Sequence, residues 1–224
     1  DKAPDDVAEK RRNGFNDLAR TLQKHKKTLS LTTETKEHLS DLQFTSVYRI
    51  PFAFSPYARE HLKVGSVAKS FNGVILTDLD DCQFYDLTGS YGVNLFGSDF
   101  YKRTMQKGLE DGAALGPALG VYHPHVASNA SRLCKISGMD EVSFHMSGTE
   151  AVMQAVRLAR YHTGRTHLVR FCGAYHGWWE DVQPGPGNPQ PPNETYTLAD
   201  LSERSLQVLR SRKNIACVLV NPLQ

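Results

Sequence analysis

The sequence predicts a layered α/β fold, and three observations in its second half predict it. Residues 142–146 alternate between apolar and polar side chains like a strand, and a helical pattern over 150–160 follows directly. Thr166 to Phe171 form a second strand-like run. An unbroken apolar run from Ile215 to Val220 is expected of a parallel strand that is buried on both faces. Strands that alternate with helices in this way favour an α/β layered domain.

Composition and charge argue against several other classes of protein. The chain has 224 residues with 40% hydrophobic content, enough for a real core, and no apolar run of about 18 residues that could cross a membrane. A net charge of +2 is too small to argue for nucleic acid as a partner. The N-terminus is charged and polar, unlike a signal peptide. The cysteines are far apart and form no C-x-x-C pair, so we expect reduced thiols in a cytoplasmic protein: Cys82, Cys134, Cys172 and Cys217.

The first element in the chain is a predicted helix, because apolar residues recur there at i, i+3, i+4 and i+7: Phe15, Leu18, Ala19 and Leu22. The basic patch over residues 24–27 is interpreted as a solvated helix end, since no aromatic residues are interleaved with it. The segment from Leu29 to Ser46 is rich in Thr, Ser and charge. We interpret it as a connection to the next unit.

A β-hairpin is predicted next, with one strand over Val74 to Leu79 and the other over Cys82 to Leu87. Asp80 and Asp81 form its polar tip, and Gly89-Ser90-Tyr91-Gly92 follows the hairpin. Ser98 or Asp99 is a predicted N-cap for a helix that carries on one side Phe100, Thr104, Met105 and Leu109.

Another helix is predicted to begin near Pro124 and to end at Gly138, burying Ala127, Ala130, Leu133 and Cys134. His123 and His125 lie two residues apart, but no acidic or thiol residue stands at metal-ligand spacing, so no metal site is predicted.

The junction Ser147-Gly148-Thr149-Glu150 has the spacing of a capping box, in which the Glu carboxylate reaches back to the cap. The helix that follows places one apolar stripe on its face: Ala151, Val152, Ala155, Val156, Leu158 and Ala159. The N–H groups and the dipole of such a helix start favour a phosphate dianion. A capped helix without any ligand explains these four residues equally well.

An aromatic loop bracketed by glycines follows the second strand and contains Tyr175, His176, Trp178 and Trp179. Aromatic residues in a loop, outside any helical stripe, are hard to explain as core alone. A Pro- and Gly-rich loop is predicted over residues 184–192, and Thr197 to Asp200 are predicted to open a helix with Leu198, Leu201, Val208 and Leu209 facing inward.

These motifs resemble those of the class III aminotransferases. The matching stretches are residues 144–151, Arg157-Leu158-Ala159-Arg160 and Gly173-Ala174-Tyr175-His176-Gly177. Within that family the chain most resembles the glutamate-1-semialdehyde aminomutase-like branch, including aminotransferase modules of secondary-metabolite pathways. The similarity runs from about Asn72 to the C-terminus and is weak or absent before Tyr48.

The resemblance implies a fold-type I, aspartate aminotransferase-like enzyme that uses pyridoxal 5'-phosphate (PLP). It implies that Ser147, Gly148 and Thr149 hold the cofactor phosphate, and that Tyr175 stacks on the pyridine ring with His176 beside it. A loop histidine that satisfies a backbone group is an equal alternative for His176. By resemblance, the segment with Ser90 and Tyr91 shapes the substrate pocket, although a tyrosine packed under the hairpin is nearly as good an explanation.

In the family, the carboxylate that binds the pyridine nitrogen and the lysine that binds the cofactor aldehyde lie beyond the strand ending here at Val220. We therefore expect the chain to be the N-terminal part of a longer catalytic unit, with an incomplete large-domain sheet and no catalytic residue of its own. The expected divisions are an N-terminal helix and linker over 1–46, a hairpin segment over 47–115 and the first part of the PLP-binding domain over 116–224.

The implied reaction moves an amino group from an amine donor to an aldehyde or ketone in a biosynthetic, secondary-metabolite pathway, catalysed by a homodimer. An intramolecular aminomutase and a catalytically inert interaction module are the alternatives. A Ser/His hydrolase built on Ser147 is excluded because the small-residue elbow G-x-S-x-G is absent. Asn221 stands where many relatives carry a glutamate that pairs with a gating arginine, so we expect no glutamate-switched dual-substrate mechanism.

Overall fold

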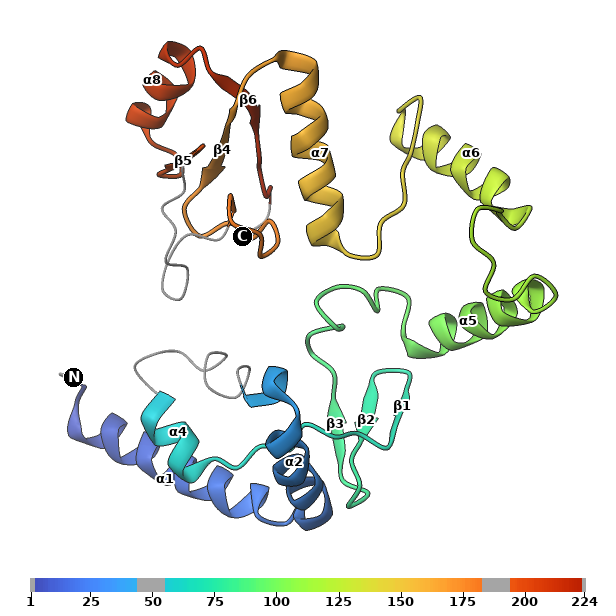
Figure 1. Cartoon of the computed structure of the whole chain (residues 1–224). Coiled ribbons are helices and arrows are strands. Elements are labelled where there is room, and N and C mark those ends of the chain that lie inside the picture. Colours follow the sequence, from blue (N-terminus) through green and yellow to red (C-terminus); the bar gives the residue numbers. More distant parts are fainter. Residues whose placement is uncertain (1–2, 44–54, 183–193, 223–224) are drawn as a thin grey trace. The chain divides into compact units, whose positions relative to one another are not determined.

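The computed structural model describes residues 3–43, 55–182 and 194–222. The predicted Pro- and Gly-rich loop therefore lies outside the described residues. The chain divides into two compact units, Asp1–His123 and Pro124–Gln224, which are described in turn (Figure 1). The three-part division expected from the sequence stays a prediction. In the described part of the chain, no helix combines the length and the apolar character needed to cross a membrane.

The first unit joins helices to a small antiparallel sheet. Its helices are α1 (Asp5–Leu22), α2 (Lys26–His38), α4 (Ser55–His61) and α5 (Ser98–Gly112). Its strands are β1 (Ser70–Asn72), β2 (Ile75–Thr77) and β3 (Gln83–Tyr85). β2 is the central strand, and Leu76 lies opposite Phe71 on one side and Phe84 on the other. The predicted N-terminal helix and hairpin are confirmed. Strand β1 was missed because three residues are too few to show a period.

Helix α2 shows that the prediction of a connection from Leu29 onward was wrong. Its threonine hydroxyls donate to backbone carbonyls four residues earlier, as Thr32 does to Thr28, 2.6 Å away. The helix start is capped from a distant part of the chain, because the Asp80 carboxylate accepts the N–H groups of Lys27 at 3.0 Å and Thr28 at 2.9 Å. A cap supplied by tertiary structure leaves no local signal in the sequence.

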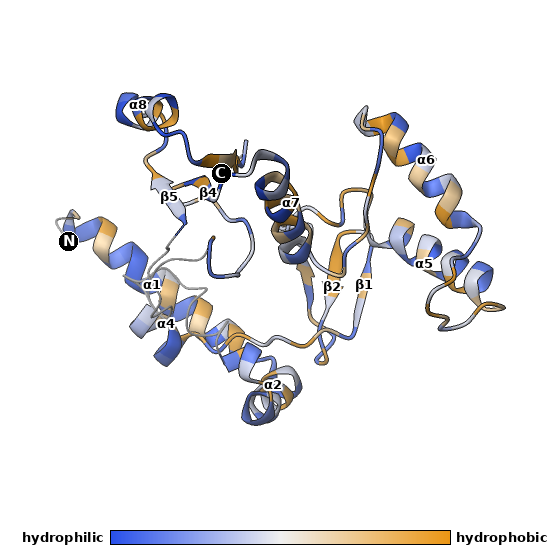
Figure 2. Cartoon of the chain, turned by 45° about the horizontal axis from the view of Figure 1, so that its top comes forward, coloured by the Kyte–Doolittle hydropathy of each residue, from blue (hydrophilic) through white to orange (hydrophobic). Residues whose placement is uncertain are grey.

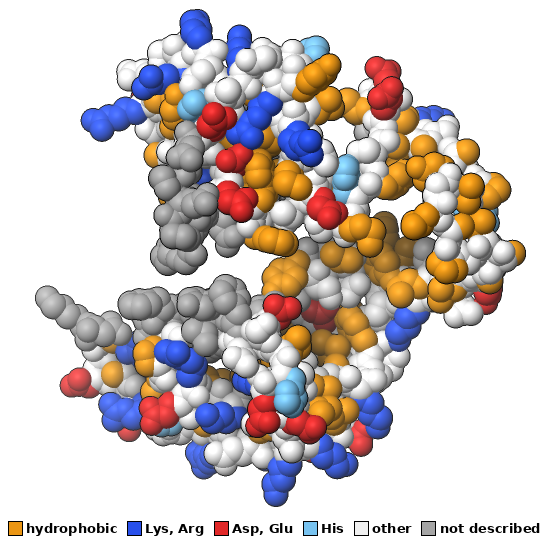
Figure 3. Space-filling model, in the orientation of Figure 1, with side chains coloured by type: hydrophobic (Ala, Val, Ile, Leu, Met, Phe, Trp, Pro, Cys, Tyr) orange, Lys and Arg blue, Asp and Glu red, His pale blue; other side chains and the backbone are white. Residues whose placement is uncertain are grey.

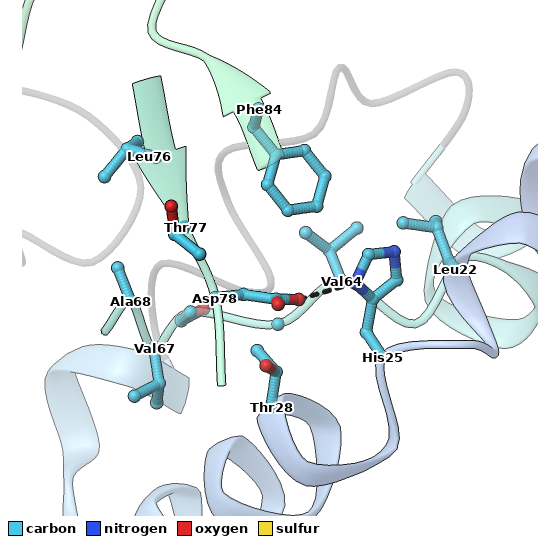
Figure 4. A pocket seen from close by; sticks show the side chains of 12 residues that line it. Leu22, His25, Thr28, Val64, Val67, Ala68, Leu76, Thr77, Asp78 and Phe84 are labelled. Carbon is cyan, nitrogen blue, oxygen red and sulfur yellow. Dashed lines mark hydrogen bonds and ion pairs between the residues drawn. The ribbon is translucent and has the colours of Figure 1, made fainter. Parts of the chain in front are cut away.

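His25 is buried, so the prediction of a solvated helix end was wrong at this residue. Its Nδ1 lies 2.5 Å from Oδ2 of Asp78, and Figure 4 shows the two side chains pointing toward one another. The other carboxylate oxygen of Asp78 accepts the N–H groups of Asp80 at 2.9 Å and Cys82 at 2.8 Å. Burial alone would raise the pKa of Asp78, but the hydrogen bonds from His25, Cys82 and Asp80 outweigh it and lower that pKa.

The His25–Asp78 pair lies at the wall of a cavity of about 320 Å³. Apolar side chains from three parts of the unit surround the pair, among them Leu22, Val64, Leu76 and Phe84 (Figure 4). Buried side chains of this unit are mostly polar in the described residues, with Ala58 as the apolar exception: His25, Thr28, Thr32, Ser55, Asp78 and Ser98. A network of hydrogen bonds therefore joins the N-terminal helices to the hairpin.

The start of α5 differs from the prediction. Gly97 is the N-cap of α5, while Ser98 donates to the Gly73 carbonyl at 3.2 Å and Asp99 accepts the Gly73 N–H at 3.1 Å. Both predicted cap residues therefore tie α5 to the β1–β2 turn. Asp81, at the polar tip of the hairpin, has a left-handed backbone with a φ of 61°.

The second unit holds a parallel sheet, with α7 packed against it. Its helices are α6 (His125–Ser137), α7 (Gly148–Thr163) and α8 (Glu203–Ser211). Its strands are β4 (His167–Phe171), β5 (Thr195–Leu198) and β6 (Ile215–Val218), in the order β5-β4-β6 and all parallel. The views in Figure 1 and Figure 2 both show the sheet between α8 and α7, and α7 packs against β6. Val156 of α7 and Leu168 and Val169 of β4 are fully buried at the centre.

The α/β prediction is confirmed, but three of its elements are corrected. Residues 142–146 form no strand ladder with any described strand, because alternation predicts the two faces of a strand and not its partner. Thr197 lies in β5, and the helix predicted there begins at Glu203 instead. β6 is a parallel strand as expected and pairs with β4, but Val218 is 40% exposed, so the strand is not buried on both faces.

Apolar side chains stay open to the surface on both units (Figure 3). Of the stripe predicted on α7 only Val156 is buried, and Leu158 is 68% exposed. α6 ends at Gly138 as predicted, in the left-handed conformation, but none of its residues is buried. Leu201, predicted to face inward, is fully exposed. Periodicity identified these helices correctly, whereas burial depends on what packs against them.

Candidate functional site

The start of α7 has the geometry of an anion site. Ser147 is the N-cap in extended conformation, and its hydroxyl accepts the Glu150 N–H at 3.2 Å, as a capping box requires. The Glu150 carboxylate accepts from Met146 at 2.9 Å, one residue before the predicted cap partner. The N–H groups of Gly148 and Thr149 belong to the first helical turn, which has no intrahelical acceptors for them. They are the donors that an anion would meet.

The aromatic loop, residues 172–182, is brought onto this helix start by Gly177. Gly177 has a φ of 99°, and a Cβ built on it would lie 2.8 Å from Oγ1 and 3.0 Å from Cα of Thr149. Only a glycine allows the two backbones to approach this closely. The two motifs that are separated in the sequence therefore meet in space at Thr149 and Gly177.

His176 and Tyr175 precede this contact and differ in their surroundings. The Nε2 atom of His176 is buried and has no hydrogen-bond partner among the described residues. Burial, and secondly the nearby positive charge of Arg170, lower the pKa of His176, so the ring is held neutral. The Tyr175 side chain is 71% exposed, which leaves a ring face available for stacking.

A group of charges lies behind the loop. Arg170 of β4 is buried, and burial lowers its pKa, although a guanidinium stays protonated. Arg160 of α7 pairs with Asp181 at 2.8 Å, while its Nη2 atom is buried without a partner in the described part of the chain. Two guanidinium groups, Arg160 and Arg170, therefore lie behind the loop, and one of them pairs with the Asp181 carboxylate.

The predicted substrate residues lie in the first unit. Gly89, Ser90, Tyr91 and Gly92 all have positive φ, between 51° and 85°, so the chain makes a left-handed turn there. Asp86 fixes the approach to this turn by accepting the N–H groups of Thr88 and Gly89. Tyr91 is 82% exposed. The substrate role of Ser90 and Tyr91 stays a prediction.

One cluster of metal-ligating residue types occurs among the described residues, and the sequence patterns did not indicate it. The candidate ligand atoms of His25, Asp78 and Cys82 lie within 4.8 Å of one another. A contact of 2.5 Å between His25 and Asp78 is a hydrogen bond with no room for an ion between the two atoms. We interpret the cluster as part of the hydrogen-bond network that holds the hairpin.

Comparison with known proteins identifies the family to which these motifs belong. Residues 56–180, more than half of the chain, match the family described as Aminotransferase class-III. The chain belongs to the class III aminotransferases. Glutamate-1-semialdehyde 2,1-aminomutase of Chlorobium phaeobacteroides is 32% identical over 170 residues, which cover 67% of this chain and 39% of that protein. The enzyme of the same name from Deinococcus deserti is 37% identical over 106 residues, or 47% of this chain and 24% of that one.

Solved structures with a similar fold agree with the family assignment. A glutamate-1-semialdehyde aminomutase from Pseudomonas aeruginosa matches 93% of this chain and 47% of its own with a TM-score of 0.76, and at 19% identity it shows the fold alone. A structure described as a transaminase with PLP bound has a TM-score of 0.64 and 26% identity, covering 82% of this chain and 48% of that one. The predicted fold type I is confirmed. The chain spans less than half the length of these relatives.

Sequence reasoning found the two motifs of the site but missed the residues that join them. Arg170 lies in the strand-like run from Thr166 to Phe171, and arginine in such a run is usually exposed to solvent. Gly177 was noted as a bracket of the loop, yet its contact with Thr149 is a tertiary feature. In the sequence, the position of Gly177 directly after Tyr175 and His176 was the one feature that could have indicated this contact. The family assignment supports PLP as the cofactor, as the resemblance implied.

Proposed function

We propose that this chain supplies the phosphate cradle and the stacking face of a PLP site in a longer class III aminotransferase. The contact of Gly177 with Thr149 carries the proposal, because it places the Ser147–Thr149 helix start beside the loop of Tyr175 and His176. The N–H groups of Gly148 and Thr149 and the hydroxyl of Thr149 would bind the phosphate. The exposed Tyr175 ring would lie against the pyridine ring. The orphaned Nε2 of His176 would find a polar partner in the bound group.

PLP, when bound, acts as an electron sink for carbanion chemistry at a substrate amine. The residues of this chain bind and orient the cofactor. The lysine and the carboxylate that the family also uses are expected in the rest of the protein. The proposed reaction transfers an amino group from a small amine donor to an aldehyde or ketone in biosynthesis, with Ser90 and Tyr91 at the substrate pocket.

An intramolecular aminomutase is the second candidate, and the names of the curated relatives favour it. Such an enzyme would convert a single amino-aldehyde substrate without any added amine, whereas a transferase would require two substrates. Product analysis with and without an added amino donor separates the two functions. Asn221, which is half-buried and lies three residues after the end of β6, carries no negative charge, consistent with an acceptor that is not recognised through a gated arginine.

Replacing Thr149 with valine in the complete protein should weaken PLP binding. The change removes a hydroxyl donor to an anion, a charge-assisted bond worth about 1.5–3 kcal/mol, so the dissociation constant should rise about 10- to 100-fold. Titration of the apo-protein with PLP, followed by its visible absorbance band, measures the effect.

Thr163→Val is the matched control, because Thr163 lies at the other end of α7 and donates to the Ala159 carbonyl. It should leave PLP affinity unchanged. An unmodified protein that develops no visible band with PLP would contradict the proposed cofactor. Equal affinity of the unmodified protein and Thr149→Val would mean that the phosphate lies elsewhere.

We also expect the complete protein to be a homodimer, as the family resemblance implies. The large apolar side chains left open on this chain, such as Leu158 and Tyr161, are compatible with a further covering surface. Light scattering coupled to size-exclusion chromatography measures the mass in solution. An active monomer would contradict the expectation.

A further inference from the structure

The aromatic loop returns to the strand from which it leaves. At its start the Cys172 N–H donates to the Leu198 carbonyl at 2.8 Å, which continues the pairing of β4 with β5. At its far end the Val182 carbonyl accepts from Nη1 of Arg170 at 3.1 Å, and Val182 is 3% exposed. A bond to β5 therefore fixes the departure of the loop, and Arg170 of β4 fixes its return.

The burial of Arg170 carries a desolvation cost that a fully exposed arginine does not have. Arg170 is only 9% exposed, and its second hydrogen bond runs from Nε to Oγ1 of Thr197, 3.1 Å away. Both acceptors that the described part of the chain provides are neutral oxygens rather than carboxylates. A buried guanidinium without an anionic partner pays a desolvation cost, and an apolar side chain in its place would avoid that cost.

The same end of the loop is held by two further elements of the unit. Nη1 of Arg160, on α7, contacts Oδ2 of Asp181 at 2.8 Å, and Oγ1 of Thr195, on β5, donates to the Asp181 carbonyl at 2.9 Å. Since α7 also begins with Ser147, Gly148 and Thr149, the loop and the proposed phosphate cradle are built on one scaffold. Between the two fixed ends lie Tyr175 and His176.

We infer that Arg170 is a positioning residue: its bonds to Val182 and Thr197 hold the aromatic loop so that Tyr175 and His176 face a ligand at the start of α7. This inference rests on the proposed function, in which that ligand is PLP. Arg170 acts through the loop and is not proposed to touch the cofactor. Its loss should loosen the loop and weaken cofactor binding more than it lowers the stability of the fold.

The experiment compares Arg170→Met and Arg170→Lys with Arg165→Met in the complete protein. Arg165 is a matched control, because it also donates to a backbone carbonyl of the same sheet, that of Ile215 at 3.1 Å, but makes no described contact with the loop. Hydrogen–deuterium exchange of the apo-protein over residues 172–182 measures the loop, and PLP titration measures affinity. Thermal unfolding measures the fold.

We expect Arg170→Met to raise loop exchange at least tenfold in the apo-protein and to raise the PLP dissociation constant at least tenfold. Arg170→Lys should recover little of either property, because a single ammonium cannot make both directed bonds. Arg165→Met should change neither. If Arg170→Met lowered the unfolding temperature but left loop exchange and PLP affinity as they were, its role would be structural only and the inference would be overturned.

Should Arg170→Met fail to fold, Thr197→Val removes the acceptor for Nε and leaves the Val182 bond in place. It should raise loop exchange and the PLP dissociation constant by smaller factors, and unchanged values would overturn the inference. Hydrogen–deuterium exchange of the loop distinguishes failure of the inference about Arg170 from failure of the proposed PLP site. If the unmodified protein bound no PLP, a loosened loop in Arg170→Met would still support positioning, and an unchanged loop would reject it.

Discussion

Replacing Gly177 with alanine is expected to lower the free energy of unfolding by about 2–5 kcal/mol. A left-handed backbone costs a non-glycine residue about 1–2 kcal/mol, and an added methyl in a packed site costs about 1–3 kcal/mol. Here the methyl would lie 3.0 Å from Cα of Thr149, which is backbone and cannot rotate away. Urea unfolding of the variant against the unmodified protein measures the change.

Gly164→Ala is the matched control for the backbone contribution. Gly164 ends α7 with a φ of 64°, and a Cβ there would meet nothing within 4 Å. Gly164→Ala should lower the free energy of unfolding only by the cost of a left-handed backbone at a non-glycine residue, about 1–2 kcal/mol. Equal costs at the two glycines would show that the contact between Gly177 and Thr149 is not tight, and the observation that carries the proposed function would be lost.

Replacing Asp78 with alanine should be similarly damaging, with an expected loss of about 3–5 kcal/mol, because removing one partner leaves buried polar groups uncompensated. The groups are the His25 ring and the N–H groups of Asp80 and Cys82. Chemical unfolding at neutral pH measures the loss. Lys69→Ala is the control, since it removes an ion pair to Asp81 of the hairpin in which both side chains are exposed, and its effect should be small.

The pH dependence of Asp78→Asn tests the charge separately from the shape. Because the pKa of Asp78 is lowered in the folded protein, ionisation of Asp78 stabilises the fold above its ordinary pKa of 3.8. That stabilisation is lost as the pH falls through the lowered pKa. The stability difference between the unmodified protein and Asp78→Asn should therefore be constant near neutral pH and shrink in acid. A difference that stayed constant into acid would mean that the Asp78 charge does not stabilise the fold.

Structural features that depend on residues close together in the sequence were predicted correctly. Features that depend on contacts between distant residues were missed. The capping spacing at Ser147 and Glu150 and the apolar run of β6 were enough to predict a helix start and a parallel strand. Residues 142–146 have a strand pattern without a ladder, because hydrogen-bond partners are chosen by tertiary structure. The α2 segment was misread because intrinsic propensity disfavours threonine in helices and the cap came from Asp80.

The candidate site shows the same division. Ser147, Gly148, Thr149, Tyr175 and His176 were identified from motif and family resemblance, and their roles stay proposals. The Gly177 contact and the buried Arg170 became visible only when β4, β5 and α7 were placed together. Neither feature produces a periodic pattern in the sequence. Each depends on how close two segments come in the folded chain, and the order of residues does not give that distance.

The capping of α2 by Asp80 has a consequence for the order of events during protein synthesis. The residue that satisfies the first N–H groups of this helix is made 52 residues after Thr28. Helices of 13 residues are marginal in water on their own, so α2 should sample open conformations on the ribosome until the hairpin has emerged. The N-terminal segment should then become protected from protease in one step with the hairpin rather than before it.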